Sequence, residues 1–388
     1  MIKMMTAYTI EVDDPEAAVS ELLEQIERKG SLLENTVGIV SCYYEFIETG
    51  AISALSERLP FDVIGCTVMG SATNEQYGLE QMTLVVLTSD DIRFSTALSE
   101  PISTDAAAKP VEDVYRQALE KLPGEPSLIF ALGPITSDAS GEIIFKALNA
   151  VSGNNIPIFG TLSNDTSLTY ENSRTFLNGQ IHQFKLALLL MHGPINPRFY
   201  VTAISDKNIQ QKKAVVTESE GYLLKRVNDM PLLDYLATIG VQKEGLSAIT
   251  ALPFLVDYGD GTKPIVLSMY SFTEAGAYCP SEMPAGTNIA LAEVDYNSVM
   301  ETAETTVRRA LEDARRNGAS GVLAIPCLTR ILVISPNSED EMKKTADLIG
   351  EEFPFAIIYS GGEMCPVYTE KRERINRFHN LTYTLMVF

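Results

Sequence analysis

One order of secondary-structure signals occurs three times along the 388-residue chain, and this repeat limits the fold more than any other feature. Each copy begins with an acidic helical pattern, continues with a short apolar strand and a polar loop, and enters a second strand through a proline. The leading helices are expected at 15–29, 107–121 and 298–317, where apolar residues recur at helical spacing. Because all copies keep this order, we interpret them as an internal repeat.

Apolar runs after these helices predict buried strands. First strands are expected at 37–42, 127–132 and 321–327, second strands at 61–66, 158–161 and 355–360, and closing strands at 82–87, 184–191 and 380–388. Strands and helices in this order predict an α/β fold of mixed α+β type, with mixed sheets covered by helices. We expect two related halves, at residues 1–228 and 229–388.

The charge balance argues against nucleic acid and membrane partners. Acidic residues outnumber basic ones by 51 to 30, and the net charge of −21 repels phosphate backbones and anionic lipids. The longest apolar stretch, 186–191, is far shorter than the roughly 20 residues of a membrane helix. The N-terminal residues lack the apolar core of a signal peptide. We therefore expect a cytoplasmic protein.

Cysteine and histidine spacing points away from metal and cofactor chemistry. The five scattered cysteines form no Cys-x-x-Cys pair, which argues against a disulfide framework or a thiolate zinc site and fits a reducing compartment. The three histidines show no metal-ligand spacing, and phosphate-loop, dinucleotide and nucleophile-elbow motifs are absent. We expect no metal, no cofactor and no catalytic residue.

Loops after the second strands are the expected ligand site, because ligands of such sheets bind beyond the carboxyl ends of strands. The most distinctive is IIYSGGEMCP, at 357–366, where Gly361 and Gly362 could offer backbone amides and Glu363 a carboxylate suited to an amino group. Tyr359 and Cys365 belong to the same run. The alternative is a tight turn in which Glu363 is solvated or caps a helix.

Two further loops carry candidate residues. In GVLAIPCLTR, at 321–330, Arg330 could bind a carboxylate in a bidentate fork or form a surface ion pair, and Cys327 could be reactive or a small core residue. In the middle copy, Ser163, Asn164 and Asp165 follow the second strand and could hydrogen-bond a ligand. These residue types are also common in turns and helix caps.

Taken together, these segments resemble the FIST family. IIYSGGEMCP and FHNLTYTLMVF (378–388, with Asn380), MPLLDYLATIG (230–240) and MPAGTNIALAEVD (283–295) resemble its C-terminal domain, and IPIFGTLSND (156–165) and GQIHQFKLALLLM (179–191) its N-terminal domain. The resemblance covers residues 34–388. The chain departs from the family at Ile325 and Pro326, where a Phe-Ser pair is frequent, and at 360–363, where the family has a Tyr-Gly-Glu turn.

The resemblance implies a stand-alone signal-transduction sensor that binds a small ligand, such as an amino acid, and acts through a separate partner protein. Two alternatives stay open. One is a protein-interaction scaffold or adaptor with a vestigial pocket. The other is an enzyme that uses Cys327 or Cys365 as nucleophile and His379 as base.

Overall fold

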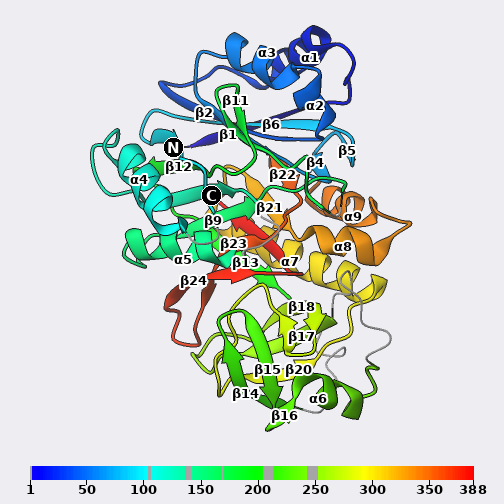
Figure 1. The fold of residues 1–388 in the computed structure, drawn as a ribbon. Coiled ribbons are helices and arrows are strands. Elements are labelled where there is room, and N and C mark those ends of the chain that lie inside the picture. The colour runs from blue at the N-terminus through cyan, green and yellow to red at the C-terminus, as the bar shows by residue number, and fades with distance from the viewer. Residues whose placement is uncertain (1, 104–105, 136–140, 168, 204–212, 243–251) are drawn as a thin grey trace.

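A computed structural model describes residues 2–103, 106–135, 141–167, 169–203, 213–242 and 252–388 (Figure 1). Three six-stranded sheets and one seven-stranded sheet organise these residues. The first sheet lies at one end of the molecule and the seven-stranded sheet at the other, with the remaining two between them. The helices are α1 (Pro15–Lys29), α2 (Glu45–Glu48), α3 (Ala51–Arg58), α4 (Ala108–Leu119), α5 (Glu142–Val151), α6 (Leu232–Thr238), α7 (Tyr296–Asn317), α8 (Leu328–Ile334) and α9 (Asp340–Ile349).

Three repeated units form the six-stranded sheets. The first unit contains β1 (Lys3–Thr9), β2 (Asn35–Cys42), β3 (Val63–Thr67), β4 (Ser71–Thr73), β5 (Tyr77–Gly78) and β6 (Met82–Ser89). The second contains β7 (Arg93–Leu98), β8 (Leu128–Gly133), β9 (Ile158–Leu162), β10 (Thr175–Leu177), β11 (Gln180–His182) and β12 (Ala187–His192). The third contains β13 (Arg198–Thr202), β21 (Val322–Pro326), β22 (Phe355–Ile358), β23 (Glu363–Tyr368), β24 (Arg374–His379) and β25 (Tyr383–Val387).

Equivalent strands take equivalent places in the three sheets. Their orders are β1-β6-β2-β3-β10-β11, β7-β12-β8-β9-β23-β24 and β13-β25-β21-β22-β4-β5. In each sheet the two strands that follow a leading helix pair in parallel. The predicted internal repeat and the predicted mixed sheets covered by helices are thereby confirmed.

Each unit donates a hairpin to the sheet of another unit. The hairpin β4–β5 of the first unit extends the third sheet, β10–β11 of the second extends the first, and β23–β24 of the third extends the second. The donation is therefore cyclic: the first unit extends the third sheet, the third unit extends the second, and the second unit extends the first. Removing one unit would therefore leave an unpaired strand edge in another.

The inner faces of the three sheets meet in one shared core, to which Val37, Phe130 and Leu323 each contribute from a different sheet. The outer faces are covered by α1 and α3, by α4 and α5, and by α7 and α9, respectively. Strands buried on both faces consist of nearly continuous apolar residues, and this explains why the apolar runs predicted them.

The fourth sheet is inserted within the third unit, between β13 and α7 along the chain, and is not a copy of the repeat. It contains β14 (Ala214–Glu220), β15 (Leu223–Val227), β16 (Met230–Pro231), β17 (Leu252–Asp257), β18 (Ile265–Thr273), β19 (Gly276–Tyr278) and β20 (Asn288–Leu291). Together with α6 it encloses a core of its own.

Gly160, in β9, allows the closest backbone approach within the second sheet. A Cβ atom there would lie 2.1 Å from the carbonyl oxygen of Ala131. Because backbone on a central strand cannot move aside, Gly160→Ala should lower the free energy of unfolding by at least about 1–3 kcal/mol. Urea denaturation measures this change. Gly78→Ala is the control, since its Cβ would meet no atom closer than 3.6 Å; equal midpoints for the two variants would contradict the argument.

Candidate functional site

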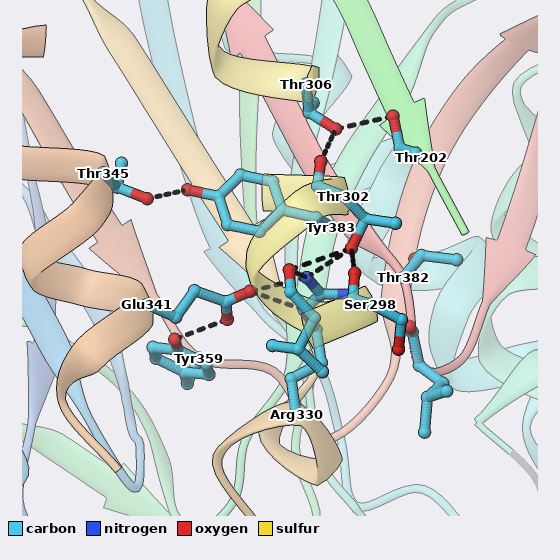
Figure 2. Close-up of polar contacts among 12 residues, drawn as sticks. Thr202, Ser298, Thr302, Thr306, Arg330, Glu341, Thr345, Tyr359, Thr382 and Tyr383 are labelled. Atoms are coloured by element: carbon cyan, nitrogen blue, oxygen red, sulfur yellow. Dashed lines mark hydrogen bonds and ion pairs between the residues drawn. The ribbon is translucent and has the colours of Figure 1, made fainter. Parts of the chain in front are cut away.

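Arg330 is completely buried in a hydrogen-bonded network (Figure 2). Its Nε and Nη2 atoms donate to Glu341 Oε1 at 2.9 and 2.5 Å, and Nη2 also donates to Val299 O and Thr302 Oγ1. Glu341 Oε2 accepts from the Tyr359 hydroxyl at 2.7 Å. Burial acts to lower the pKa of Arg330, but Glu341 outweighs this effect and keeps that pKa above its usual value. The pair is therefore an ion pair inside the protein.

This network joins α7, α8 and α9 to the third sheet. The Arg330 guanidinium lies 5.4 Å from the ring centroid of Tyr383, whose hydroxyl is 2.8 Å from Thr345 Oγ1. The remaining nitrogen, Nη1, donates to Leu381 O at 3.4 Å. All three guanidinium nitrogens thus donate within the protein. A ligand role for Arg330 and Tyr359 stays a prediction, and this geometry gives both side chains a structural role.

Glu363 lies at the start of β23, completely buried at the junction of the second sheet and the third unit. Its Oε2 atom accepts from the backbone N–H and the hydroxyl of Thr382, at 3.3 and 2.8 Å. Its Oε1 atom has no nitrogen or oxygen hydrogen-bond partner among the described residues, although the Cys327 thiol interacts with the carboxyl group. Burial raises the pKa of Glu363 to about 8, although Thr382 and Cys327 act to lower it. The carboxyl group is therefore mostly protonated at neutral pH.

Cys327 directly follows β21 and is the N-cap residue of α8. Its Sγ atom lies 3.5 Å from Thr329 Oγ1 and 4.0 Å from Asn380 Nδ2. Burial, with a further contribution from Glu363, raises the pKa of Cys327. A protonated thiol is a poor nucleophile.

Cys365 and His379 are no better suited to catalysis than Cys327 is. Burial raises the pKa of the Cys365 thiol, and Glu363 raises it further. Burial lowers the pKa of His379 to about 3, although the imidazole Nε2 lies 2.9 Å from the carbonyl oxygen of Cys365. A neutral imidazole of such low pKa is a weak base near pH 7.

The fourth sheet reaches this region through Ser268, in β18. The Ser268 backbone N–H donates to Asn380 Oδ1 at 3.2 Å, and its hydroxyl is buried without a hydrogen-bond partner among the described residues. We call Cys327, Glu363 and Ser268, together with the half-buried Asn380, the buried polar cluster. Sequence alone gave no signal for Ser268, because its strand lies outside the repeat.

The candidate loop of the second unit approaches the same cluster through Tyr170. Burial raises the pKa of Tyr170 to about 12, with further contributions from Cys327 and Asp165. The Asp165 carboxylate accepts from the backbone N–H groups of Ser167 and Asn172, so it closes its own loop. No sequence pattern distinguished Tyr170 from other loop residues.

Other predicted ligand groups are engaged with the protein. Ser163 Oγ lies 2.6 Å from Ser173 Oγ. The Gly361 N–H donates to Leu162 O, and the Gly362 N–H donates to Ser360 Oγ. These bonds pack the loops after β9 and β22 against each other. The candidate loops therefore lie against each other, but these amides already have acceptors.

Asn164, of the second unit, forms hydrogen bonds to both the first and the third unit. Its backbone N–H donates to Thr67 O, its Oδ1 accepts from the Met69 N–H at 2.7 Å, and its Nδ2 donates to Tyr359 O at 2.8 Å. The side chain is completely buried. Its contacts are those of a structural link between the units, and a role in ligand binding stays a prediction.

A surface hollow of about 350 Å³ lies apart from these residues. Its lining consists of residues 32–36, Pro60, Phe61 and Phe94, all near the first sheet. It contains no candidate ligand residue. The candidate ligand residues lie in and around the buried polar cluster and not at this hollow.

No helix in the described part of the chain is long and apolar enough to cross a membrane. Within the same described ranges, no group of three or more His, Cys, Asp and Glu side chains is placed to hold a metal ion.

Family models match most of the chain. The FIST N domain matches residues 36–230, and the FIST C domain matches residues 231–366. The chain belongs to the FIST family. FIST domains are generally sensory signal-transduction modules. The FIST N match runs from β2 to the start of β16, so it includes the whole second unit and the first strands of the fourth sheet. The FIST C match contains the rest of the fourth sheet and continues through α7, β21 and β22 to the start of β23.

Comparison with curated proteins gives no match. Among solved structures, a cyanuric acid hydrolase from A. caulinodans is similar over 100% of this chain and 98% of its own, with 9% identity and a TM-score of 0.37. A chorismatase is similar over 100% of this chain and 99% of its own, with the same identity and TM-score. These scores are too low to bear on the function of this FIST protein.

Arg330→Ala should lower the free energy of unfolding by about 3–5 kcal/mol, because it leaves the Glu341 carboxylate buried without its cation. Chemical denaturation measures the change. The double variant Arg330→Met with Glu341→Leu should recover most of the loss, since it removes both charges. A change below about 1 kcal/mol for Arg330→Ala would contradict the assigned structural role.

Stability should fall as pH rises from 6.5 to 8. Because the pKa of Glu363 is raised from 4.5 to about 8, the folded protein retains a proton that the unfolded chain loses above pH 4.5. This stabilisation is complete below pH 4.5 and is lost as pH rises toward the pKa of Glu363 in the folded state. The free energy of unfolding falls by at most about 1.4 kcal/mol per pH unit. Denaturation midpoints across this range measure the slope.

Glu363→Gln should flatten this slope, whereas Glu171→Gln, an exposed acid, should leave it unchanged. His379 does not interfere above pH 6.5, because its lowered pKa affects stability only below its unfolded value of 6.5. Equal slopes in the wild type and Glu363→Gln would exclude the raised pKa.

Proposed function

We propose that this FIST protein is a cytoplasmic sensor that binds a small polar ligand at the buried polar cluster and signals through a separate partner protein. The observation that carries the proposal is the unpartnered Oε1 atom of Glu363. Leaving a buried polar atom without a partner costs about 1–3 kcal/mol, which a hydrogen bond from a ligand would recover. An amino acid is one candidate, because its ammonium group would suit Glu363.

Ligand access requires movement, because Glu363, Cys327 and Ser268 are buried. The contacts between the fourth sheet and the repeated units include an ion pair between Arg377 and Asp260 and one between Lys146 and Glu282. Partly exposed ion pairs of this kind contribute little stability. Movement of the fourth sheet away from the repeated units would uncover Ser268. A ligand that binds one of these two arrangements, closed or open, more tightly than the other would shift the equilibrium between them.

Composition supports the remaining parts of the proposal. All five cysteines are free and buried, as suits a reducing cytoplasm. The net charge of −21 disfavours nucleic acid as a partner and leaves a protein as the expected recipient of the signal.

Two other functions compete with a sensor. The closed state of the cluster favours a protein-interaction scaffold with a vestigial pocket. A cysteine-dependent enzyme is disfavoured, because burial raises the pKa of both Cys327 and Cys365 and lowers that of His379. The two thiols and the imidazole therefore lack an activated form near neutral pH.

A thermal-shift screen with amino acids and other small metabolites tests the sensor. Ligand at 100 times its Kd stabilises the folded state by about 2.7 kcal/mol, which raises Tm by several degrees. We expect at least one compound to raise the Tm of the wild type and of Glu171→Gln, but not of Glu363→Gln. A screen without any shift would favour the scaffold. Fast iodoacetamide labelling of Cys327 at neutral pH would favour the enzyme.

A further inference from the structure

We infer that the ligand carries both a cationic and an anionic group, the first bound between Glu363 and His379 and the second bound by Arg377. This inference rests on the proposed function and assigns two ligand-contacting residues, His379 and Arg377, to it. Arg377 takes the anion-binding role predicted for Arg330, because the three guanidinium nitrogens of Arg330 already donate within the protein.

These three side chains share one face of the exchanged hairpin β23–β24. Glu363 pairs directly with His379, and Arg377 lies two residues before His379 on the same strand. Side chains two residues apart on a strand point to the same side, and directly opposed residues do so as well. Cys365, which belongs to this face, packs in the shared core. The face is therefore the inner one.

Unpartnered polar atoms gather on this face. Glu363 Oε1, His379 Nδ1 and Arg377 Nε are buried and have no hydrogen-bond partner among the described residues, and the Ser268 hydroxyl of the fourth sheet is in the same state. Glu363 and His379 are completely buried side chains. Buried polar groups without partners are rare in folded proteins, so four in one region indicate a ligand that supplies the missing bonds.

The chemistry of these atoms defines the two ends of the ligand. His379 Nε2 lies 2.9 Å from the carbonyl oxygen of Cys365, so this nitrogen carries the proton and Nδ1 is left as an acceptor. In its ionised form, which a bound cation favours, Glu363 provides a second acceptor, Oε1, directly across the hairpin. An ammonium group can donate to both. Arg377 Nε is a donor only, and it suits a carboxylate or another anionic oxygen.

The charge of Arg377 is partly compensated by neighbouring groups of the protein. It pairs with Asp260, and its guanidinium lies 4.8 Å from the ring centroid of Tyr258, both in the turn between β17 and β18. The ligand's anionic group would add a bond at Nε. A second arginine of the loops, Arg174, donates to the carbonyl oxygens of Glu171 and Ser173 and lies over the Tyr44 ring, which leaves Arg377 as the better anion partner.

The experiment compares each ligand with its two halves. The probes are the twenty standard amino acids, β-alanine and γ-aminobutyrate, each measured beside the amine that lacks its carboxylate and the acid that lacks its amino group. We expect at least one of the zwitterions to bind at least tenfold more tightly than either half, by calorimetry on the full chain. Such a zwitterion should also raise Tm most.

Arg377→Gln separates binding from folding. We expect it to weaken the zwitterion at least tenfold and to leave the affinity for the matching amine unchanged, which a purely structural role would not do. Arg374→Gln, on the same strand and exposed, is the control and should change neither affinity. Asp260→Asn keeps the arginine but removes its ion pair, and it should leave zwitterion binding at least as tight.

The outcomes distinguish this inference from the proposed function. Equal binding of the amine and the zwitterion, or equal weakening of both by Arg377→Gln, would overturn the anion subsite while the sensor stands. No binding of any probe or metabolite would overturn both. Should Glu363→Gln fail to fold, the comparison of zwitterion with amine in the wild type and in Arg377→Gln still decides.

Discussion

The exchange of hairpins among the three units is the constraint on which the rest of the structure depends. Each six-stranded sheet is completed by strands from another unit, so the shared inner core forms only when all three are folded. Asn164 adds a polar link at the same place, because it bonds Thr67 and Met69 of the first unit and Tyr359 of the third. The loops after the parallel strands are therefore held together by the fold itself.

This arrangement explains why the buried polar cluster lies where it does. Glu363 is the first residue of an exchanged hairpin, so it pairs with Thr161 of the second unit while its side chain bonds Thr382 of the third. Ser268 adds a contact from the fourth sheet. A group at the junction of three bodies responds to movement of any of them, and a sensor requires this property.

Sequence reasoning located the repeat because its signals are local. Apolar runs buried on both faces and helices with one apolar face can be read from a short window. The exchanged hairpins could not be read in this way, because the partners of β4, β10 and β23 lie in other units, and pairing over such distances leaves no local pattern. Glu363 was identified as a candidate ligand carboxylate in a turn, but its burial at the start of β23 could not be read from the sequence, and the partners of Arg330 depended on how α8 and α9 pack.

A comparison of the two buried glutamates distinguishes structure from function. Glu341 uses both oxygens, one for Arg330 and one for Tyr359, so its charge is compensated where the chain folds. Glu363 uses only Oε2, and burial without a cation raises its pKa to about 8. A carboxyl group that the fold does not satisfy lowers stability, and a hydrophobic residue would avoid this cost. Packing does not explain this unsatisfied acid, and it is the observation on which the proposed ligand rests.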